Sequence, residues 1–316
     1  MTMTSTFAPK ITQKHLLSLK DYSTEEILDL LSLAAELKKP ENKYTPLLQN
    51  KVLGMIFEKS STRTRVSFEA GMLQLGGHAM YLSTRDIQMG RGETIADTAR
   101  VLSGYLDGIM IRTFEQATVQ ELADNSSIPV INGLTDDFHP CQVLADLLTI
   151  QEQFGSLQGK KMAYIGDGNN MANSLMIGAA KVGMDITVAA PAAYAPKPEM
   201  VALAQQFAKE TGANIHVTAD PVEAVTKADV IYTDVWASMG QEQEALERLE
   251  HFKNFQVNEE LVQHANPDYI FMHCLPAHRE EEVTTGVLEG AHSVVFQEAE
   301  NRLHAQKALL VALLNN

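Results

Sequence analysis

The chain has 316 residues, of which 45% are hydrophobic and 21% are charged, a composition typical of globular proteins and long enough for two domains. A formal net charge of -15 argues against nucleic acid and anionic membranes as partners. The only cysteines are Cys141 and Cys274, so we expect reduced thiols and a cytoplasmic location. Residues 1–14 lack the apolar core of a signal peptide, and no apolar run reaches membrane-spanning length.

Strands and helices alternate through the first half of the chain. Short apolar runs predict strands at 52–57, 78–82, 108–111 and 129–131. Helical patterns fill the intervals and end with a long helix from about 142 to 154, while 83–93 reads as a polar loop with two glycines. This alternation predicts an α/β domain with a parallel sheet.

A second alternation begins after a boundary at residues 155–159. Strands are predicted at 162–165, 186–190, 214–217, 230–232, 269–272 and 293–296, and helices at 170–182, 198–210, 222–228, within 241–262 and at 298–314. Two such runs predict two α/β domains with parallel sheets.

Donor side chains gather where the strand at 52–57 gives way to the next helix. Five of them follow one another, Ser61, Thr62, Arg63, Thr64 and Arg65. The first turn of a helix offers unpaired N–H groups and the positive end of the helix dipole, and arginine forks match phosphate oxygens. An ordinary helix cap explains one serine or threonine but not five successive donors, so we predict an anion site.

Polar residues also follow the ends of the other predicted strands, where open parallel sheets bind their ligands. They are Arg112, His139 and Gln142 in the first half, and Asn169, Asn170, Asp234, Ser238, His273 and Cys274 in the second. Cations and a histidine gather in the first half, and amide, acid, hydroxyl and thiol groups in the second. We infer two adjoining half-sites, one for a phosphate-bearing anion and one for a small polar amine or amino acid.

Simpler roles remain open for several of these residues. Arg112 could form a surface ion pair, and His139 and Asp234 could cap the turns that follow them. Cys141 could be a small buried apolar side chain. Each of these readings is reasonable for one residue alone, and the repetition at successive strand ends favours the two half-sites.

Metal and dinucleotide sites are both disfavoured. His273, Cys274 and His278 could suggest zinc, but no second cluster supplies further ligands at usual spacings, so we predict no metal. The loop at 166–171 resembles a glycine-rich dinucleotide turn, but Met171 occupies its third glycine position. The following strand also lacks the acid that binds a ribose, so we expect no nicotinamide cofactor.

Four motifs occur in order along the chain: Ser61-Thr-Arg-Thr-Arg65, His139-Pro-Cys-Gln142, Asp234-Val-Trp-Ala-Ser-Met-Gly240 and His273-Cys-Leu-Pro276. The first two resemble the carbamoyl phosphate motifs of the aspartate/ornithine carbamoyltransferase family. The last two resemble the second-substrate motifs of its ornithine-specific members. Glu280 stands where relatives often have glycine, and the resemblance otherwise covers nearly the whole chain.

The resemblance implies a fold of two doubly wound α/β domains with parallel sheets, joined by two long helices. Residues 1–150 would bind carbamoyl phosphate and residues 155–297 would bind ornithine, with the C-terminal helix 298–316 returning to the first domain. The family contacts to carbamoyl phosphate map onto Ser61, Thr62, Arg63, Thr64, Gln88, Arg112, His139, Gln142, Cys274, Leu275 and Arg302, with Gln88 coming from a neighbouring subunit. The ornithine contacts map onto Asn170, Asp234, Ser238 and Met239, and the catalytic roles onto Arg63, His139 and Cys274.

The activity implied by the resemblance is transfer of the carbamoyl group from carbamoyl phosphate to the side-chain amine of L-ornithine, which gives L-citrulline and phosphate. It places the protein in arginine metabolism, with biosynthesis as the expected direction. The implied assembly is a homotrimer or a multiple of trimers, without a cofactor. The alternatives are carbamoyl transfer to another amine such as putrescine, and binding of a phosphate ligand without catalysis.

Overall fold

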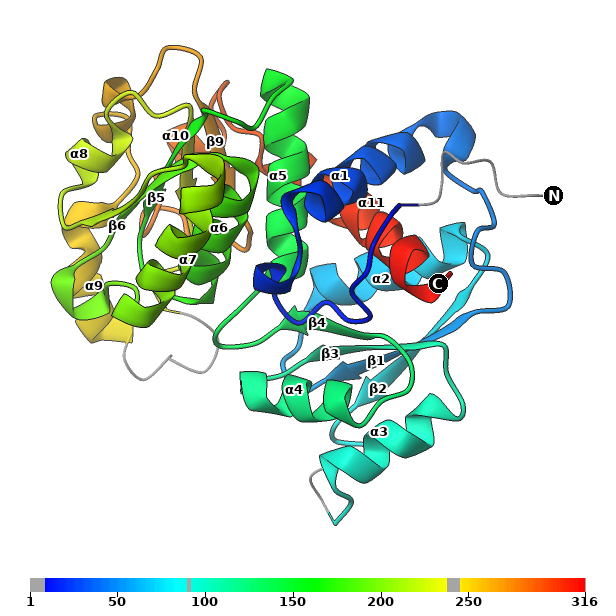
Figure 1. The fold of residues 1–316 in the computed structure, drawn as a ribbon. Helices are drawn as coiled ribbons and strands as arrows, with labels where there is room; N and C mark the ends of the chain where they lie inside the picture. The colour runs from blue at the N-terminus through cyan, green and yellow to red at the C-terminus, as the bar shows by residue number, and fades with distance from the viewer. Residues whose placement is uncertain (1–8, 90–91, 238–244, 316) are drawn as a thin grey trace. The chain divides into compact units, whose positions relative to one another are not determined.

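A computed structural model describes residues 9–89, 92–237 and 245–315, and the chain divides into two compact units (Figure 1). Unit 1 comprises Met1–Leu148 and Glu300–Asn316, and unit 2 comprises Thr149–Ala299. Two continuous helices, α5 (Pro140–Phe154) and α11 (Val295–Leu314), run from one unit into the other. The predicted fold class, two α/β domains with parallel sheets joined by two long helices, is confirmed.

Unit 1 is built on a four-stranded parallel sheet in the order β2-β1-β3-β4. Its strands are β1 (Val52–Phe57), β2 (His78–Ser83), β3 (Gly108–Arg112) and β4 (Val130–Leu134), and its remaining helices are α1 (Thr24–Lys38), α2 (Thr62–Gln74), α3 (Ile95–Ser103) and α4 (Gln116–Asp124). α3 and α4 share a buried apolar cluster with β1 and β3, while α2 packs against α11 (Figure 1). All four strands are parallel, and the chain passes from β1 to β2 on one side and then to β3 on the other, so a ligand crevice is expected at the carboxyl ends of β1 and β3.

Unit 2 is built on a five-stranded parallel sheet in the order β7-β6-β5-β8-β9. Its elements are β5 (Lys161–Ile165), α6 (Asn170–Val182), β6 (Asp185–Ala189), α7 (Pro198–Thr211), β7 (Ile215–Thr218), α8 (Pro221–Val225), β8 (Val230–Thr233), α9 (Ala245–Phe252), β9 (Ile270–His273) and α10 (Thr285–Leu288). β5, β6, β8 and β9 are mostly buried, as expected when helices cover both faces of a parallel sheet, whereas the edge strand β7 buries only Ile215. The chain passes from β5 to β6 on one side and later to β8 on the other, so an equivalent crevice is expected at the carboxyl ends of β5 and β8.

The predicted strand at 293–296 was wrong. Ser293 forms only an isolated bridge with Phe271, and the N–H of Val294 donates to the Phe271 carbonyl at 3.0 Å. Helix α11 then begins at Val295 and takes up the rest of that apolar run. The helical region expected within 241–262 is α9 followed by two 3-10 turns, with residues 241–244 outside the described range.

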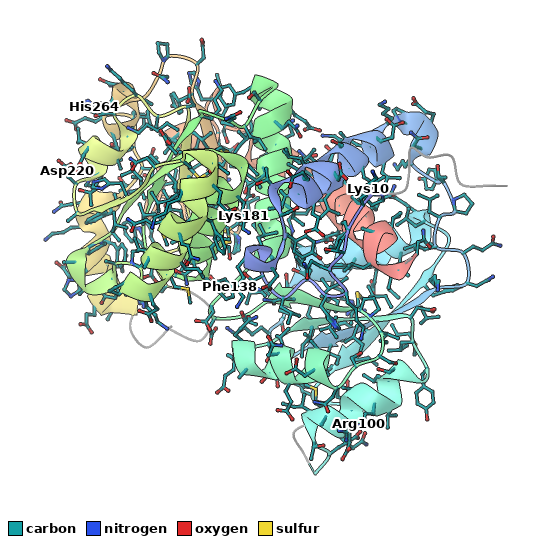
Figure 2. The ribbon with its side chains drawn as sticks, viewed as in Figure 1. Lys10, Arg100, Phe138, Lys181, Asp220 and His264 are labelled. Carbon is teal, nitrogen blue, oxygen red and sulfur yellow. The ribbon has the colours of Figure 1, made fainter. Side chains whose placement is uncertain are left out.

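The nine other predicted strands are confirmed, with their ends shifted by at most three residues. Charged side chains lie at the surface of both units, as Arg100 on α3 and Asp220 at the start of α8 illustrate (Figure 2). Within residues 9–89, 92–237 and 245–315, every helix is too short or too polar to cross a lipid bilayer.

Candidate active site

The turn between β1 and α2 forms the first part of the candidate site in unit 1. Ser61 is the N-cap of α2, and its hydroxyl accepts a hydrogen bond from the Thr64 N–H at 3.2 Å. Thr64 is fully buried, Arg63 is half-buried and Thr62 is exposed. The Ser61 cap thus leaves the other N–H groups of the first turn available to an anion.

Arg65, in the same motif, is directed elsewhere. Its guanidinium lies over the ring of Tyr81 on β2, 4.0 Å from the ring centroid, and Nε donates to Glu69 at 3.4 Å. Arg63 and Arg65 therefore differ in role, although the sequence presents them as equivalent forks.

Helix α11 brings Arg302 to this turn from the far end of the chain. Arg302 is 3% exposed, and its guanidinium donates to Gln142 Oε1 at 2.7 Å and to Thr64 Oγ1 at 3.2 Å. Gln142 is 1% exposed and its Nε2 donates to Asp146 at 2.8 Å. Three of the predicted carbamoyl phosphate contacts, distant in sequence, thus form one buried hydrogen-bonded chain.

His139 lies directly before α5, buried among positive charges. Burial, and then the charges of Arg302, Arg112 and Arg63, hold the pKa of His139 well below its usual value. The imidazole is therefore neutral near pH 7 and can donate one hydrogen bond without carrying charge. Arg112, the last residue of β3, is itself only 8% exposed.

These residues form a cation cradle, by which we mean Arg63, Thr64, Arg112, His139, Gln142 and Arg302. Guanidinium groups that are buried near one another repel and are costly to desolvate unless an anion accompanies them. The cradle is therefore suited to a doubly charged anion such as a phosphate group.

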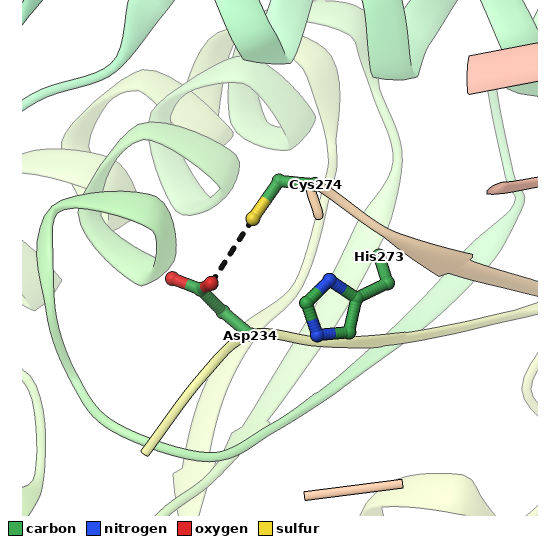
Figure 3. Close-up of side chains that lie close together, drawn as sticks. All are labelled: Asp234, His273 and Cys274. Atoms are coloured by element: carbon green, nitrogen blue, oxygen red, sulfur yellow. Dashed lines mark hydrogen bonds between the residues drawn. The ribbon is translucent and has the colours of Figure 1, made fainter. Parts of the chain in front are cut away.

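The candidate site in unit 2 is built around Asp234, directly after β8 (Figure 3). Its carboxylate accepts hydrogen bonds from Asn169 Nδ2 at 3.0 Å and from the Cys274 thiol at 3.0 Å. Asn169 is also the N-cap of α6, where its Oδ1 accepts from the backbone N–H of Met171 at 2.9 Å. An acid, an amide and a thiol thus meet at the ends of β5, β8 and β9, with negative charge at the centre.

A buried histidine fixes the turn that carries Cys274. His273 Nδ1 accepts the Leu275 N–H at 2.8 Å, so its proton lies on Nε2, which faces Glu282 at 3.1 Å. Leu275 has φ +54°, a left-handed conformation that costs a bulky residue about 1–2 kcal/mol. The Leu275–His273 hydrogen bond holds that conformation in place.

Asp234, His273 and Cys274 offer side-chain atoms within 4.8 Å of one another that could serve as metal ligands (Figure 3). Asp234 stands 40 residues before Cys274, so the local spacing around His273 does not reveal it as a possible ligand. However, Nδ1 of His273 already accepts the Leu275 N–H, and the Cys274 thiol donates to Asp234. In this arrangement Asp234 and Cys274 bond to each other, and both ring nitrogens of His273 are engaged by Leu275 and Glu282.

Of the remaining predicted site residues, three lie in the described part of the chain and two lie outside it. Asn170 begins α6 and Leu275 lies half-buried beside Cys274. Gln88 is exposed in the loop after β2 and stays a prediction. Ser238 and Met239 lie outside the described residues.

The sequence named one positioning residue, Asn169, without its partner, and missed another, Glu282. Asn169 was noted at the strand end, but its bond to Asp234 needed the pairing of β5 with β8. Glu282, whose side chain is completely buried against His273, stands in a run of three acids whose other members are exposed. A carboxylate in such a run reads as solvated surface, and only the fold distinguishes it.

Comparisons with known proteins agree with this geometry. A sequence model described as "Aspartate/ornithine carbamoyltransferase, carbamoyl-P binding domain" matches residues 14–152, and one described as "Aspartate/ornithine carbamoyltransferase, Asp/Orn binding domain" matches residues 158–313. The chain belongs to the aspartate/ornithine carbamoyltransferase family. The family membership predicted from the four motifs is thereby confirmed.

Relatives within the carbamoyltransferase family match the chain over its full length. It is 65% identical to an ornithine carbamoyltransferase of Anoxybacillus flavithermus, over 99% of this chain and 100% of that protein. It is 60% identical to an ornithine carbamoyltransferase of Bacillus cereus, over 99% of this chain and 98% of that protein. The solved ornithine carbamoyltransferase of Pyrococcus furiosus superposes with a TM-score of 0.94 at 54% identity, covering 99% of both chains.

Proposed function

We propose that the protein transfers the carbamoyl group of carbamoyl phosphate to the side-chain amine of L-ornithine, giving L-citrulline and phosphate. The observation that carries this proposal is the neutral His139 set among Arg302, Arg112 and Arg63. The cations suit a phosphate group, and a neutral imidazole can donate a hydrogen bond to a carbonyl group beside it. Membership of the carbamoyltransferase family supports the same assignment.

In this proposal the cation cradle holds the phosphate end of carbamoyl phosphate. Arg63, Arg112 and the first turn of α2 would bind phosphate oxygens, with the hydroxyls of Ser61, Thr62 and Thr64 as neutral donors. His139 would donate to the carbonyl oxygen, and Gln142 would bind the carbamoyl amide. The Gln142 side chain is oriented by Arg302, which donates to its Oε1, and by Asp146, which accepts from its Nε2.

The unit 2 site would hold ornithine. Asp234, oriented by Asn169, supplies a carboxylate for the cationic α-amino group. Asn170, Ser238 and Met239 are proposed as its further contacts, and Cys274 and Leu275 as neighbours of the side-chain amine. Because the two α-substituents are charged, this site would favour ornithine over putrescine, which lacks the α-carboxylate.

The reaction requires the ornithine side-chain amine in its uncharged form. Its nitrogen attacks the carbonyl carbon, the bond from that carbon to the phosphate oxygen breaks, and the proton that the nitrogen loses is taken up by the departing phosphate. His139 and Arg63 would stabilise the negative charge that develops on the carbonyl oxygen, and one such donor is worth about 3 kcal/mol in acyl transfer. Arg63 and Arg112 would neutralise the departing phosphate, and much of the rate would come from holding two small molecules together.

We further propose a homotrimer, or a multiple of trimers, in which Gln88 reaches the carbamoyl phosphate site of a neighbouring subunit. The proposal is supported by exposed apolar side chains on α2 and on the edge strand β2, which leads into the Gln88 loop. Val66, Leu73, Met80 and Tyr81 are 56%, 74%, 50% and 39% exposed. An apolar sheet edge of this kind is normally covered by another chain or element.

A biosynthetic role in the cytoplasm completes the proposal. One similar solved structure, at 45% identity and a TM-score of 0.91 over 96% of this chain and 99% of that chain, is described as an anabolic ornithine carbamoyltransferase from Campylobacter jejuni. Cys141 and Cys274 are free thiols, in keeping with a reducing compartment.

A colorimetric citrulline assay tests the activity directly. Purified protein is mixed with carbamoyl phosphate and, in turn, ornithine, putrescine or aspartate. We expect carbamoylated product with ornithine and about tenfold to a hundredfold less with putrescine, because the one charged contact it lacks, that to the α-carboxylate, costs about 1.5–3 kcal/mol. Aspartate has no side-chain amine and should give a loss at least as large. Equal rates with putrescine, or no product with ornithine, would refute the assignment.

A further inference from the structure

Glu58 and Lys59 stand between β1 and the anion-binding turn, and both reach sideways to neighbouring loops. We propose that they are positioning residues that hold the three loops of the cation cradle in register, Glu58 through Thr113 and Lys59 through Asp136. The inference rests on the proposed carbamoyl phosphate site, since it concerns the loops that would form it.

Glu58 ties the exit of β1 to the exit of β3. Its carboxylate accepts a hydrogen bond from the hydroxyl of Thr113, and its backbone N–H donates to the Arg112 carbonyl at 2.9 Å. Thr113 is 1% exposed and directly follows Arg112. Glu58 therefore holds the chain directly after a cradle arginine, through its side chain at Thr113 and through its backbone N–H at the Arg112 carbonyl. On the other side of β3, the pairing with β4 is irregular between Ile111 and Arg112.

Lys59 ties the exit of β1 to that of β4, two strands away. Its Nζ pairs with the carboxylate of Asp136 and lies over the ring of Phe114, 4.3 Å from the ring centroid. Because the sheet order is β1-β3-β4, the Lys59 side chain must cross the loop after β3 to reach Asp136. Asp136 is also held to that middle loop, since its N–H donates to the Phe114 carbonyl at 2.8 Å.

The Glu58–Thr113 and Lys59–Asp136 contacts both lie close in sequence to cradle residues. Asp136 lies three residues before His139, and Thr113 lies one residue after Arg112. Lys59 itself is only 7% exposed and its ammonium is engaged by Asp136, so it acts on the ligand through loop position. The carboxylate of Asp136 also offsets the positive charge of the buried Lys59 side chain. The Asp136 side chain is 60% exposed, and solvent weakens this ion pair.

Steady-state kinetics of four variants tests the inference: Lys59→Met, Asp136→Ala, the double variant, and Lys59→Arg. Each single loss should raise the KM for carbamoyl phosphate about tenfold, below the roughly hundredfold that a 1 Å misplacement can cost. The double variant should be no worse than either single one, because both remove the same tether. Lys59→Arg should restore most of the loss, since arginine can pair with Asp136 and stack on Phe114.

Two controls make the result specific. The KM for ornithine should stay within about twofold in all four variants, because unit 2 is unchanged, whereas a general loss of fold would affect both substrates. Lys39→Met removes an exposed lysine paired with Glu36 in the same unit and should leave both KM values unchanged. Calorimetric titration with inorganic phosphate should show the same pattern as the KM for carbamoyl phosphate.

Three outcomes would count against the inference. An unchanged KM for carbamoyl phosphate in Lys59→Met would refute the positioning role of Lys59. A raised KM in Lys59→Met with a normal KM in Asp136→Ala would show that Lys59 touches the ligand directly and is no positioning residue. If the unmodified protein bound no phosphate and made no citrulline, the proposed function itself would be overturned, a failure visible before any variant is made.

Discussion

The two half-sites occupy equivalent places in the two units, beyond the carboxyl ends of adjacent parallel strands, yet their charges are opposite. In unit 1, Arg112 and Arg302 are buried around a neutral His139. In unit 2, Asp234 accepts bonds from Asn169 and Cys274. The fold supplies the position in both cases, and the residues at the strand ends decide whether a phosphate or an ammonium group is attracted.

The two half-sites also differ in how they are assembled. The cation cradle is built from four elements, α2, β3, α5 and α11. Helix α11 places Arg302 beside Thr64 on α2 and Gln142 on α5. The unit 2 site is assembled from three successive strand ends of one sheet. Variants can therefore separate the two halves by substrate, and the following predictions run from the largest expected effect to the smallest.

Arg63→Ala should lower kcat about a hundredfold to a thousandfold, the usual loss when one oxyanion-stabilising donor is removed. Arg63 is a half-buried side chain in a turn, so the fold should persist. Arg65→Ala is the matched control, because Arg65 faces Tyr81 and Glu69. Similar kinetics in the two variants would remove Arg63 from the site.

Asp234→Ala should raise the KM for ornithine about tenfold to a hundredfold, since a hydrogen bond to a charged group contributes about 1.5–3 kcal/mol. The KM for carbamoyl phosphate should change by less than about twofold, because the cradle lies in the other unit. Substrate-saturation curves for both ligands provide the measurement. Equal losses for the two substrates would contradict the division into half-sites.

Asn169→Ala tests whether a helix cap also orients the acid. Loss of the cap should destabilise unit 2 by about 1 kcal/mol, and loss of the bond to Asp234 should raise the KM for ornithine about fivefold. Asp220→Ala removes the cap of α8 in the same unit, where Asp220 accepts from Val222 and Glu223. Urea unfolding should show similar losses of stability in both variants, and the KM for ornithine should rise only in Asn169→Ala. Equal KM values in the two variants would show that Asn169 acts only as a helix cap.

Acid should weaken unit 1 through His15. Burial, with the nearby charge of Lys14, lowers the pKa of His15 to about 4, and its Nδ1 accepts the Val130 N–H at 3.0 Å. A lowered pKa means that the unfolded chain binds the proton more readily, so this stability is present above pH 6.5 and is lost as the pH falls towards 4. Because His15 is only half-buried, we expect a loss on the order of 1 kcal/mol between pH 7 and pH 5.

His15→Asn provides the comparison for that measurement. The asparagine Oδ1 can accept the same N–H but does not titrate, so urea unfolding of this variant should lose less stability between the two pH values. An unchanged pH dependence would show that another group causes the loss.

The sequence predicted the fold well because each strand is a short apolar run and each helix follows it within a few residues. It failed at 293–296, where a β-branched run looks like a strand but only Ser293 finds a pairing partner before α11 begins. It also treated Arg63 and Arg65 alike, since the direction of two arginines in one turn depends on which neighbours the helix presents.

The strand-end positions of the proposed half-sites could be read from the sequence, but the contacts of their supporting residues could not. Strand-end positions can be read from a single sequence, so Arg112, His139 and Asp234 could be named in advance. Glu282, Asn169 and Lys59 act through partners 9, 65 and 77 residues away, so even Asn169, which follows a predicted strand, could not be paired with Asp234 in advance. Such contacts follow from strand order, which the sequence leaves open.

Calorimetric titration with carbamoyl phosphate tests the central claim most directly, that a cation cradle in unit 1 binds the phosphate end of one substrate on its own. We predict measurable heat with the unmodified protein and with Asp234→Ala, and binding at least tenfold weaker with Arg63→Ala, since a charged hydrogen bond contributes about 1.5–3 kcal/mol. The absence of binding to the unmodified protein, or a loss caused by Asp234→Ala and spared by Arg63→Ala, would contradict it.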